Sequence, residues 1–251
     1  MMGPFRIYLH YGWFIKTDYR QREVWLGEEN TCTMKNVVQT NSVRFRKSQL
    51  IYLKIKRLLD ILCSLAGMAV SAPVFLAAAI AVKVETPGGR IIYQQDRVGK
   101  DGRIFHLYKF RTMHTDAPQL STQEFSNAQS YITHVGRIMR STSIDELPQL
   151  WNVLIGDMSL VGPRPLILRE RDVHEKRFRY GLYQIRPGIT GMAQTHGRDD
   201  MDDDQKVEWD RKYVEQISFL TDFKLCFRTI FKVIQREGVR DNDDKNLPLH
   251  E

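Results

Sequence analysis

The 251-residue sequence has only three cysteines, Cys32, Cys63 and Cys226, and they lie far apart. It has no CxxC pair, which argues against a zinc site and against a disulfide framework, and suits a reducing compartment. Walker and GxGxxG motifs are also missing, so a P-loop or Rossmann enzyme is not expected. The first 15 residues lack the long apolar run of a secretory signal peptide.

Apolar residues and positive charge are both plentiful. Hydrophobic residues make up 42% of the chain, which is enough for a packed core and argues against global disorder. Lysine and arginine (37) exceed aspartate and glutamate (30), giving a net charge of +7. Such an excess suits nucleic acid, anionic lipid headgroups or phosphorylated substrates, and the bulk charge does not choose among these three.

One segment, from Ile61 to Val82, contains no charged residue. As a single helix it would be about 33 Å long, close to the roughly 30 Å of a bilayer's hydrocarbon core. Pro73 lies near its middle and would remove one helical hydrogen bond. Ser71 is placed where its hydroxyl could satisfy a freed carbonyl, as transmembrane helices allow.

Basic residues flank this segment on both sides, so the positive-inside rule places both of its ends on the cytoplasmic face. A helix broken at Pro73 that enters and leaves the same leaflet explains the proline and the charges together. A plain membrane span and a buried core helix are the alternatives. The flanking residues are Arg44, Arg46, Lys47, Lys54, Lys56 and Arg57 before the segment, and Lys83, Arg90, Arg97 and Lys100 after it.

The rest of the sequence predicts a mostly helical α+β protein with a small β-hairpin. Two β-rich runs, 89–98 and 103–113, are joined by the turn signal Gly99-Lys100-Asp101-Gly102. Residues 168–183 and 205–236 are expected to be helical. Aromatic and basic residues recur at helical spacing from 223 to 234, as in an interfacial amphipathic helix or in a helix packed on a core.

These features divide the chain into four parts. We expect residues 1–50 to form an N-terminal extension, 51–85 a re-entrant membrane helix, 86–238 a cytoplasmic domain that would carry any catalytic residues, and 239–251 a tail.

Two neighbouring carboxylates, Asp145 and Glu146, are the central candidates for chemistry. They stand where a helix is expected to begin, and free N–H groups at a helix start would keep Asp145 ionised, as a nucleophile must be. Because neighbouring residues on a helix point in different directions, one carboxylate could attack while the other binds a metal. The structural alternative is a capping box formed by Ser143 and Glu146.

Arginines close to glycine and proline are candidates for phosphate binding, because a guanidinium group matches phosphate oxygens with a rigid fork. A diphosphate would need a divalent cation as well. The alternative is that these arginines are solvated surface residues, and the acidic run 199–204 is expected to be a solvated loop or a helix N-terminus. The arginines concerned are Arg111, Arg140, Arg164, Arg186 and Arg198.

Several long motifs resemble the bacterial sugar transferase family, the monotopic polyprenyl-phosphate phosphoglycosyl transferases. They are KRLLD at 56–60, the proline-broken apolar segment, YKFRTM at 108–113, and the runs 140–165 and 186–198. The resemblance covers residues 54–236 and implies a re-entrant helix anchored at the cytoplasmic face by Lys56, Arg57 and Asp60. Pro73 would form its break, although Ala72 stands where the family usually has serine.

The resemblance implies a two-step reaction. Asp145 would attack the sugar-bearing phosphate of a UDP-sugar and release UMP, and polyprenyl phosphate would then take the sugar phosphate from the aspartate. Glu146 would bind Mg²⁺, and ping-pong kinetics would follow. The implied phosphate-facing residues are Arg111, Arg140 and Arg164, and the implied nucleotide-binding residue is Arg198.

The resemblance also implies a cellular setting. The partners would be a UDP-sugar, polyprenyl phosphate (undecaprenyl phosphate is expected) and the lipid bilayer. The enzyme would lie in the bacterial inner membrane with its catalytic domain on the cytoplasmic face, at the first membrane step of glycoconjugate synthesis. Large members of the family carry extra transmembrane helices before this domain. This sequence shows none there, so it is similar to the small, catalytic-domain-only form. A homodimer is compatible with the resemblance.

Two other classes of protein compete with this interpretation. A non-catalytic membrane-surface protein that binds anionic lipid would use the apolar segment and the basic helix but not Asp145. A nucleic-acid-binding module would show strongly salt-dependent affinity, and the sequence has no recognisable nucleic-acid motif, so no nucleic acid partner is expected.

Overall fold

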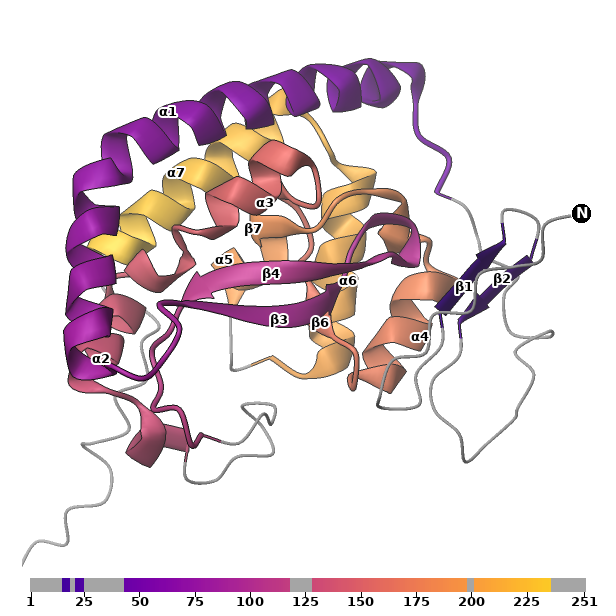
Figure 1. Cartoon of the computed structure of the whole chain (residues 1–251). Coiled ribbons are helices and arrows are strands. Elements are labelled where there is room, and N and C mark those ends of the chain that lie inside the picture. The colour runs from indigo at the N-terminus through magenta and orange to yellow at the C-terminus, as the bar shows by residue number, and fades with distance from the viewer. Residues whose placement is uncertain (1–14, 19–20, 25–42, 118–127, 198–200, 236–251) are drawn as a thin grey trace, which may run out of the picture.

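The computed structural model describes residues 15–18, 21–24, 43–117, 128–197 and 201–235 of the chain. The described part is mostly helical, with small sheets packed among the helices (Figure 1), as the predicted α+β class requires. The tail at 239–251 lies outside the described residues. So does the N-terminal extension, apart from residues 43–50 and the antiparallel pair β1 (Ile15–Asp18) and β2 (Gln21–Val24).

The apolar segment forms the middle of α1 (Lys47–Glu85), a helix of 39 residues. It is long and apolar enough to cross a membrane, and only 11% of its most apolar 18-residue stretch is buried. Figure 1 shows α1 running along the top of the molecule and then turning down the left-hand side. Pro73 lies inside α1, and an internal proline is a common cause of such a change of direction.

The predicted role of Ser71 at the proline is wrong. A proline at 73 leaves the carbonyl four residues earlier, that of Ala69, without its helical donor. The Ser71 hydroxyl instead donates to the carbonyl of Met68, over 3.5 Å. The helix continues through Pro73 without this compensation, so the expected break is a bend in one uninterrupted helix.

The burial pattern of α1 is the reverse of that of a helix in a soluble protein. Its N-terminal half turns polar side chains toward the protein, and Gln49, Lys56, Asp60 and Ser64 are all buried. Its large apolar side chains point outward, and Val70, for example, is 82% exposed. A helix that hides its polar residues and exposes its apolar ones is suited to lipid contact.

The predicted hairpin is confirmed. Strands β3 (Ile92–Val98) and β4 (Ile104–Phe110) pair antiparallel, with Val98 opposite Ile104. The short 3₁₀ turn η2 (Lys100–Gly102) joins them, with positive φ at Asp101 and Gly102. Strand β6 (Leu166–Ile167) adds to the β3 edge, and β5 (Ser159–Val161) pairs parallel with β7 (Gly188–Thr190).

Shorter helices surround the hairpin. They are η3 (Ala128–Tyr131), α2 (His134–Ser141), η4 (Ile144–Glu146), α3 (Gln149–Ile155), α4 (Arg171–Arg179), η5 (Leu182–Gln184), α5 (Met192–His196), α6 (Asp203–Glu215) and α7 (Phe219–Gln235). The expected helix 168–183 is shorter than predicted, since Gly181 adopts a φ of 65° after α4. The expected helix 205–236 is two helices.

The acidic run leads into the N-terminus of a helix, which is one of the two structures predicted for it; the other was a solvated loop. Asp202 caps α6, and its carboxylate accepts a hydrogen bond from the backbone N–H of Gln205 at 2.7 Å. Asp199 and Asp200 lie outside the described residues.

The largest core cluster joins α4, α6 and α7 to β5, with Tyr213 and Val214 at its centre. A second cluster ties the C-terminal half of α1 to β4 and α2, through Val82, Phe110 and Met139. The two clusters hold α1 against the domain at both ends of its length.

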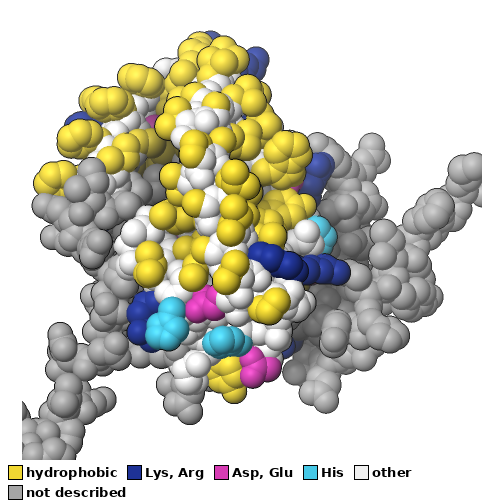
Figure 2. Space-filling view, turned by 60° about the vertical axis from the view of Figure 1, so that its left-hand side comes forward, with side chains coloured by type: hydrophobic (Ala, Val, Ile, Leu, Met, Phe, Trp, Pro, Cys, Tyr) yellow, Lys and Arg dark blue, Asp and Glu magenta, His cyan; other side chains and the backbone are white. Residues whose placement is uncertain are grey.

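Exposed apolar side chains gather on α1, α7 and one side of α3, and this surface is called the apolar face below. Figure 2 shows hydrophobic side chains along the length of α1. So large an apolar surface marks an interaction site for membrane or protein. Besides the α1 residues Leu50, Ile51, Ile55, Leu58, Leu62, Leu65, Val70, Val74, Phe75, Leu76, Ile80 and Val84, it includes Trp151, Ile155, Phe219, Leu220, Phe223, Phe227, Ile230 and Phe231.

Candidate active site

The candidate carboxylates lie on the short turn η4, immediately before α3. Ser143 precedes them with a left-handed backbone (φ 57°, ψ 18°), a conformation that non-glycine residues adopt at some cost. The capping-box alternative is wrong, because the Ser143 side chain makes no capping hydrogen bond. The turn is closed by the backbone instead, with the N–H of Glu146 donating to the Ser143 carbonyl over 3.2 Å.

Asp145 is surrounded by charge of both signs. Burial and the neighbouring Glu146 raise the pKa of Asp145 to about 6, while the cations of Lys109 and Arg140 oppose this rise. The sequence suggested the opposite direction, since a helix start favours the ionised form. In the folded chain, burial and the charge of Glu146 outweigh the cations, so the pKa of Asp145 is raised. Even so, about nine-tenths of a carboxyl group with a pKa near 6 is ionised at pH 7.

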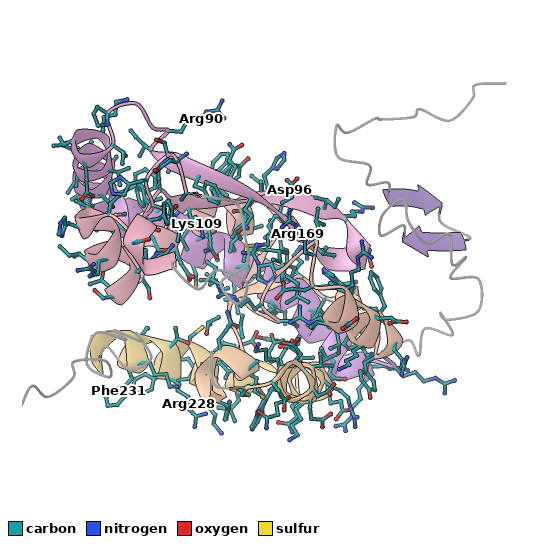
Figure 3. The ribbon with its side chains drawn as sticks, turned by 90° about the horizontal axis from the view of Figure 1, so that it is seen from below. Arg90, Asp96, Lys109, Arg169, Arg228 and Phe231 are labelled. Atoms are coloured by element: carbon teal, nitrogen blue, oxygen red, sulfur yellow. The ribbon has the colours of Figure 1, made fainter. Side chains whose placement is uncertain are left out.

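Lys109, on β4, is a site residue that the sequence analysis missed. Burial, together with the nearby cations of Arg140 and Arg97, lowers the pKa of Lys109 to about 8, against the pull of Asp145. Figure 3 shows Lys109 on the hairpin, between the strands and α2. The sequence signal for Lys109 was its place in the YKFRTM motif, from which only Arg111 was selected as a candidate.

Arg140 lies near enough to Asp145 for their charges to interact. Its Nε donates to the hydroxyl of Thr112 over 2.8 Å, which fixes the guanidinium group at the end of β4. Gly136 lets α2 pack this closely, because a Cβ there would stand only 2.1 Å from the Thr112 carbonyl oxygen. The close packing of α2 on this segment therefore sets the position of Arg140.

Arg164 faces the second carboxylate, with 4.0 Å between its Nη1 and Oε1 of Glu146. Its loop is held from two sides. Arg97 donates to the carbonyl of Pro165 over 3.0 Å, and Arg177 donates to the carbonyl of Arg164 over 2.7 Å.

A buried ion pair supports this loop from below. The Arg177 guanidinium group also binds Asp210 of α6 at 2.5 Å, and both side chains are almost fully buried. Neither residue was singled out by the sequence analysis, because the partners stand 33 positions apart and no local pattern links them.

The remaining predicted arginines are placed differently. Arg111 donates from Nε to the Arg90 carbonyl at 2.9 Å and lies over the ring of Tyr93, so its contacts are on the hairpin side. Arg186 donates from Nε to the Gly156 carbonyl, at the other end of α3. Arg198 lies outside the described residues.

The KRLLD residues tie α1 to three elements of the domain. The Lys56 ammonium group binds Asp222 of α7 at 2.5 Å. Arg57 donates to the carbonyls of Val153 and Leu154, at the end of α3. Asp60 accepts from the backbone N–H of Leu160, in β5, at 3.0 Å. These contacts fix the N-terminal half of α1, while Pro73 is exposed.

The donor set at the turn fits a magnesium ion only together with a substrate. Within the described residues no group of three or more His, Cys, Asp or Glu side chains could hold a metal ion. Two adjacent carboxylates with mutual repulsion remain. Mg²⁺ is commonly held by one or two carboxylates plus phosphate oxygens and water.

Comparisons with a family model and with individual relatives all identify sugar transferases. Residues 51–236 match the family described as bacterial sugar transferase. The chain is 40% identical over 195 residues to the UDP-N-acetylgalactosamine-undecaprenyl-phosphate N-acetylgalactosaminephosphotransferase of Aeromonas hydrophila, covering 76% of this chain and 46% of that protein. It is 37% identical to the undecaprenyl-phosphate galactose phosphotransferase of Salmonella typhimurium, covering 73% and 41%.

The chain spans less than half the length of these two relatives. Its match to the UDP-glucose:undecaprenyl-phosphate glucose-1-phosphate transferase of Caulobacter vibrioides is 40% identical and covers 70% of this chain and 68% of that protein. In each comparison, most of this chain takes part. The family match alone covers most of the residues, including all but the first turn of α1, the hairpin and the Asp145–Glu146 turn. The chain therefore belongs to the bacterial sugar transferase family.

Proposed function

We propose that the protein transfers a sugar-1-phosphate from a UDP-sugar to polyprenyl phosphate, with undecaprenyl phosphate as the expected acceptor. The supporting observation is the Asp145 carboxylate, set among Lys109 and Arg140 in a chain of this family. The relatives named above carry sugar-phosphate transfer to undecaprenyl phosphate in their names.

The proposed reaction has two displacements at one phosphorus atom. The Asp145 carboxylate attacks the β-phosphorus of the UDP-sugar, the bond to the bridging oxygen breaks, and UMP leaves with that electron pair. A phosphate oxygen of the acceptor lipid then attacks the same phosphorus, and the aspartate leaves. The products are polyprenyl-diphosphate-sugar and UMP, and the free carboxylate is restored.

The cations around Asp145 have a clear use in this reaction. Lys109 and Arg140 would bind the phosphoryl oxygens as the nucleophile approaches, and this offsets the repulsion between a carboxylate and a diphosphate. Arg164, whose guanidinium group lies 4.0 Å from the Glu146 carboxylate, would bind a second phosphate group. A bound Mg²⁺ would neutralise diphosphate charge, and Glu146 is the residue we assign to hold it.

The apolar face explains how a soluble donor and a lipid acceptor could meet. We infer that α1 and the aromatic side of α7 rest in one leaflet, with both ends of the bent α1 on the cytoplasmic face of the inner membrane. The acceptor's phosphate group would then lie at the headgroup plane, near the turn that carries Asp145. Anchoring the enzyme there turns a two-phase encounter into a positioned one.

Release of UMP from purified protein tests the reaction class. The protein, in lipid nanodiscs with Mg²⁺ and undecaprenyl phosphate, is given a panel of UDP-sugars beside an Asp145→Asn variant. We expect UMP from at least one donor and only background from the variant. Equal release from the variant, or none from any donor with folded protein, would reject the proposal and favour a non-catalytic lipid-binding role.

A further inference from the structure

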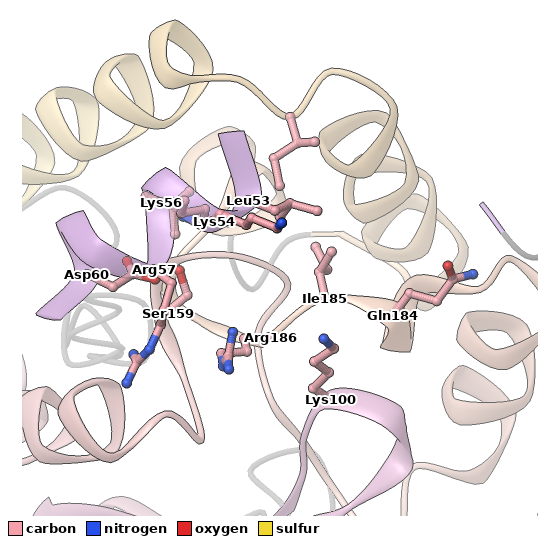
Figure 4. Close-up of a pocket in the computed structure, with 12 residues that line it drawn as sticks. Leu53, Lys54, Lys56, Arg57, Asp60, Lys100, Ser159, Gln184, Ile185 and Arg186 are labelled. Carbon is pink, nitrogen blue, oxygen red and sulfur yellow. The ribbon is translucent and has the colours of Figure 1, made fainter. Parts of the chain in front are cut away.

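A cavity of about 410 Å³ lies between the N-terminal half of α1, strand β5 and residues 184–186 (Figure 4). It is separate from the candidate active site. The cavity is near the C-terminal end of α3, where Arg57 and Arg186 bind the last carbonyls, whereas Asp145 precedes the helix. The seven residues of α3 put roughly 10 Å of helix between the two places.

The cavity is strongly basic. Its lining contains five cationic residues, Lys54, Lys56, Arg57, Lys100 and Arg186, against the single carboxylate of Asp60. Two of the cations are already used by the fold. Lys56 is paired with a buried carboxylate on α7, and Arg57 has one hydrogen bond from each Nη to an α3 carbonyl.

The other cavity residues have donor groups without an acceptor in the part of the chain that the structure describes. The hydroxyl of Ser159 is on a residue that is 1% exposed, and its Oγ has no hydrogen-bond partner within the described residues. Arg186 uses only Nε, which leaves both Nη groups without a protein acceptor in the part of the chain that the structure describes. Lys54 and Lys100 are exposed at the rim.

These donors come from different elements and line one cavity. In Figure 4, Lys100 reaches from the η2 turn toward Arg186, while Ser159 and the α1 residues line the opposite side. A buried hydroxyl is normally hydrogen-bonded, so the lone Oγ of Ser159 indicates that something else supplies the acceptor. An anion with several oxygens would accept from the hydroxyl, the guanidinium fork and the ammonium groups together.

We propose that this cavity is a binding site for a phosphate group, carried by a lipid headgroup or by a soluble phosphate. The fork of Arg186 and the two lysines are suited to phosphate oxygens. The rim of the cavity adjoins the apolar face, because Leu50, Ile51 and Leu58 of the same stretch of α1 are exposed. A lipid phosphate could enter from there with its acyl chains beside α1. The site is independent of the reaction proposed above.

Native mass spectrometry of the delipidated full chain tests the site. The probes are phosphatidylglycerol, phosphatidylcholine and inorganic phosphate. We expect saturable one-to-one binding of phosphatidylglycerol. Loss of that binding on adding millimolar inorganic phosphate identifies a general phosphate site, and resistance to it identifies a lipid headgroup site. If neither anionic probe binds in preference to phosphatidylcholine, the proposal is wrong.

A charge-matched pair of variants separates the site from general surface charge. Lys54→Gln with Lys100→Gln removes two rim cations, while Lys47→Gln with Arg103→Gln removes two cations from the same helix and the same turn, outside the cavity. We expect roughly tenfold weaker binding in the first pair, the worth of about one charged hydrogen bond, and little change in the second. Equal loss in both pairs would overturn the proposal.

Ser159→Ala provides a further variant. The change removes a hydroxyl that has no partner within the described residues, so the fold loses no hydrogen bond that the structure shows. We expect unchanged thermal unfolding and about threefold weaker phosphate binding. Unchanged binding in Ser159→Ala would show that the buried hydroxyl does not face the anion, and would contradict the site as described.

Discussion

Replacing Lys109 by methionine tests the electrostatics around Asp145. The pKa of Asp145 is about 6, and it is the balance of burial and Glu146, which raise it, against Lys109 and Arg140, which lower it. Removing the Lys109 cation removes one of the two opposing charges. A nearby opposite charge typically shifts a carboxyl pKa by one unit or more, so we expect about 7 in the variant.

The size of the effect follows from the fraction of Asp145 that is ionised. At pH 6 that fraction falls from about one-half to about one-tenth, and at pH 7 from about nine-tenths to about one-half. The acidic limb of the kcat/KM profile, which reports the free enzyme, should therefore move about one unit toward higher pH. The plateau of the profile should also drop, because methionine supplies no cation to bind the phosphoryl oxygens. The position of the acidic limb is therefore the informative quantity.

Lys109→Arg is the matched control. It keeps the positive charge, so the acidic limb should stay where the native enzyme has it. Because the pKa of Lys109 is about 8, the native enzyme should also lose activity above pH 8, and arginine, which stays protonated there, should remove that alkaline limb. An acidic limb that does not move in Lys109→Met, or that moves equally in Lys109→Arg, would refute the reasoning.

Three further predictions concern the fold and the membrane. Lys56→Met removes the counter-ion of the buried Asp222 carboxylate and leaves it only the hydrogen bonds from Tyr52 and Tyr213. This should cost about 3–5 kcal/mol and lower the midpoint of thermal unfolding by roughly 10 °C, with no such fall for Lys54→Met at an exposed neighbour. Gly136→Ala would put a methyl group 2.1 Å from a backbone oxygen and should lower both thermal stability and activity, whereas Gly88→Ala, with open space around it, should change neither. Phe227, 65% exposed on α7, should weaken liposome binding severalfold when changed to Ser, but not when changed to Leu, as measured by flotation.

Local sequence was sufficient to predict those elements whose causes are local. The Gly99–Gly102 turn between two β-rich runs predicts the hairpin, and the structure has it with positive φ at Asp101 and Gly102. Asp202 at the start of α6 is a similar case, since an acidic side chain commonly caps a helix. The lack of charge in the middle of α1 was likewise enough to predict a membrane-length helix.

Other features depend on contacts between distant residues and could not be predicted. Lys56 belongs to a recognisable motif, but its partner Asp222 is 166 positions away. The direction of the Asp145 pKa was missed because burial, the largest cause of the rise, is a property of the folded chain. The contacts of Arg111 with the Arg90 carbonyl and the Tyr93 ring also join residues about 20 positions apart, and no local pattern predicts them.

The central claim is that the sugar phosphate passes through Asp145, and trapping it there tests this most directly. A UDP-sugar labelled with ³²P in its β-phosphate is mixed with enzyme and Mg²⁺ without acceptor, and the protein is denatured and digested. We predict label on the peptide that contains Asp145, none on Asp145→Asn, and transfer of the label to lipid when polyprenyl phosphate is added. Product formation at full rate with no label on the protein, or equal labelling of the variant, would contradict the account.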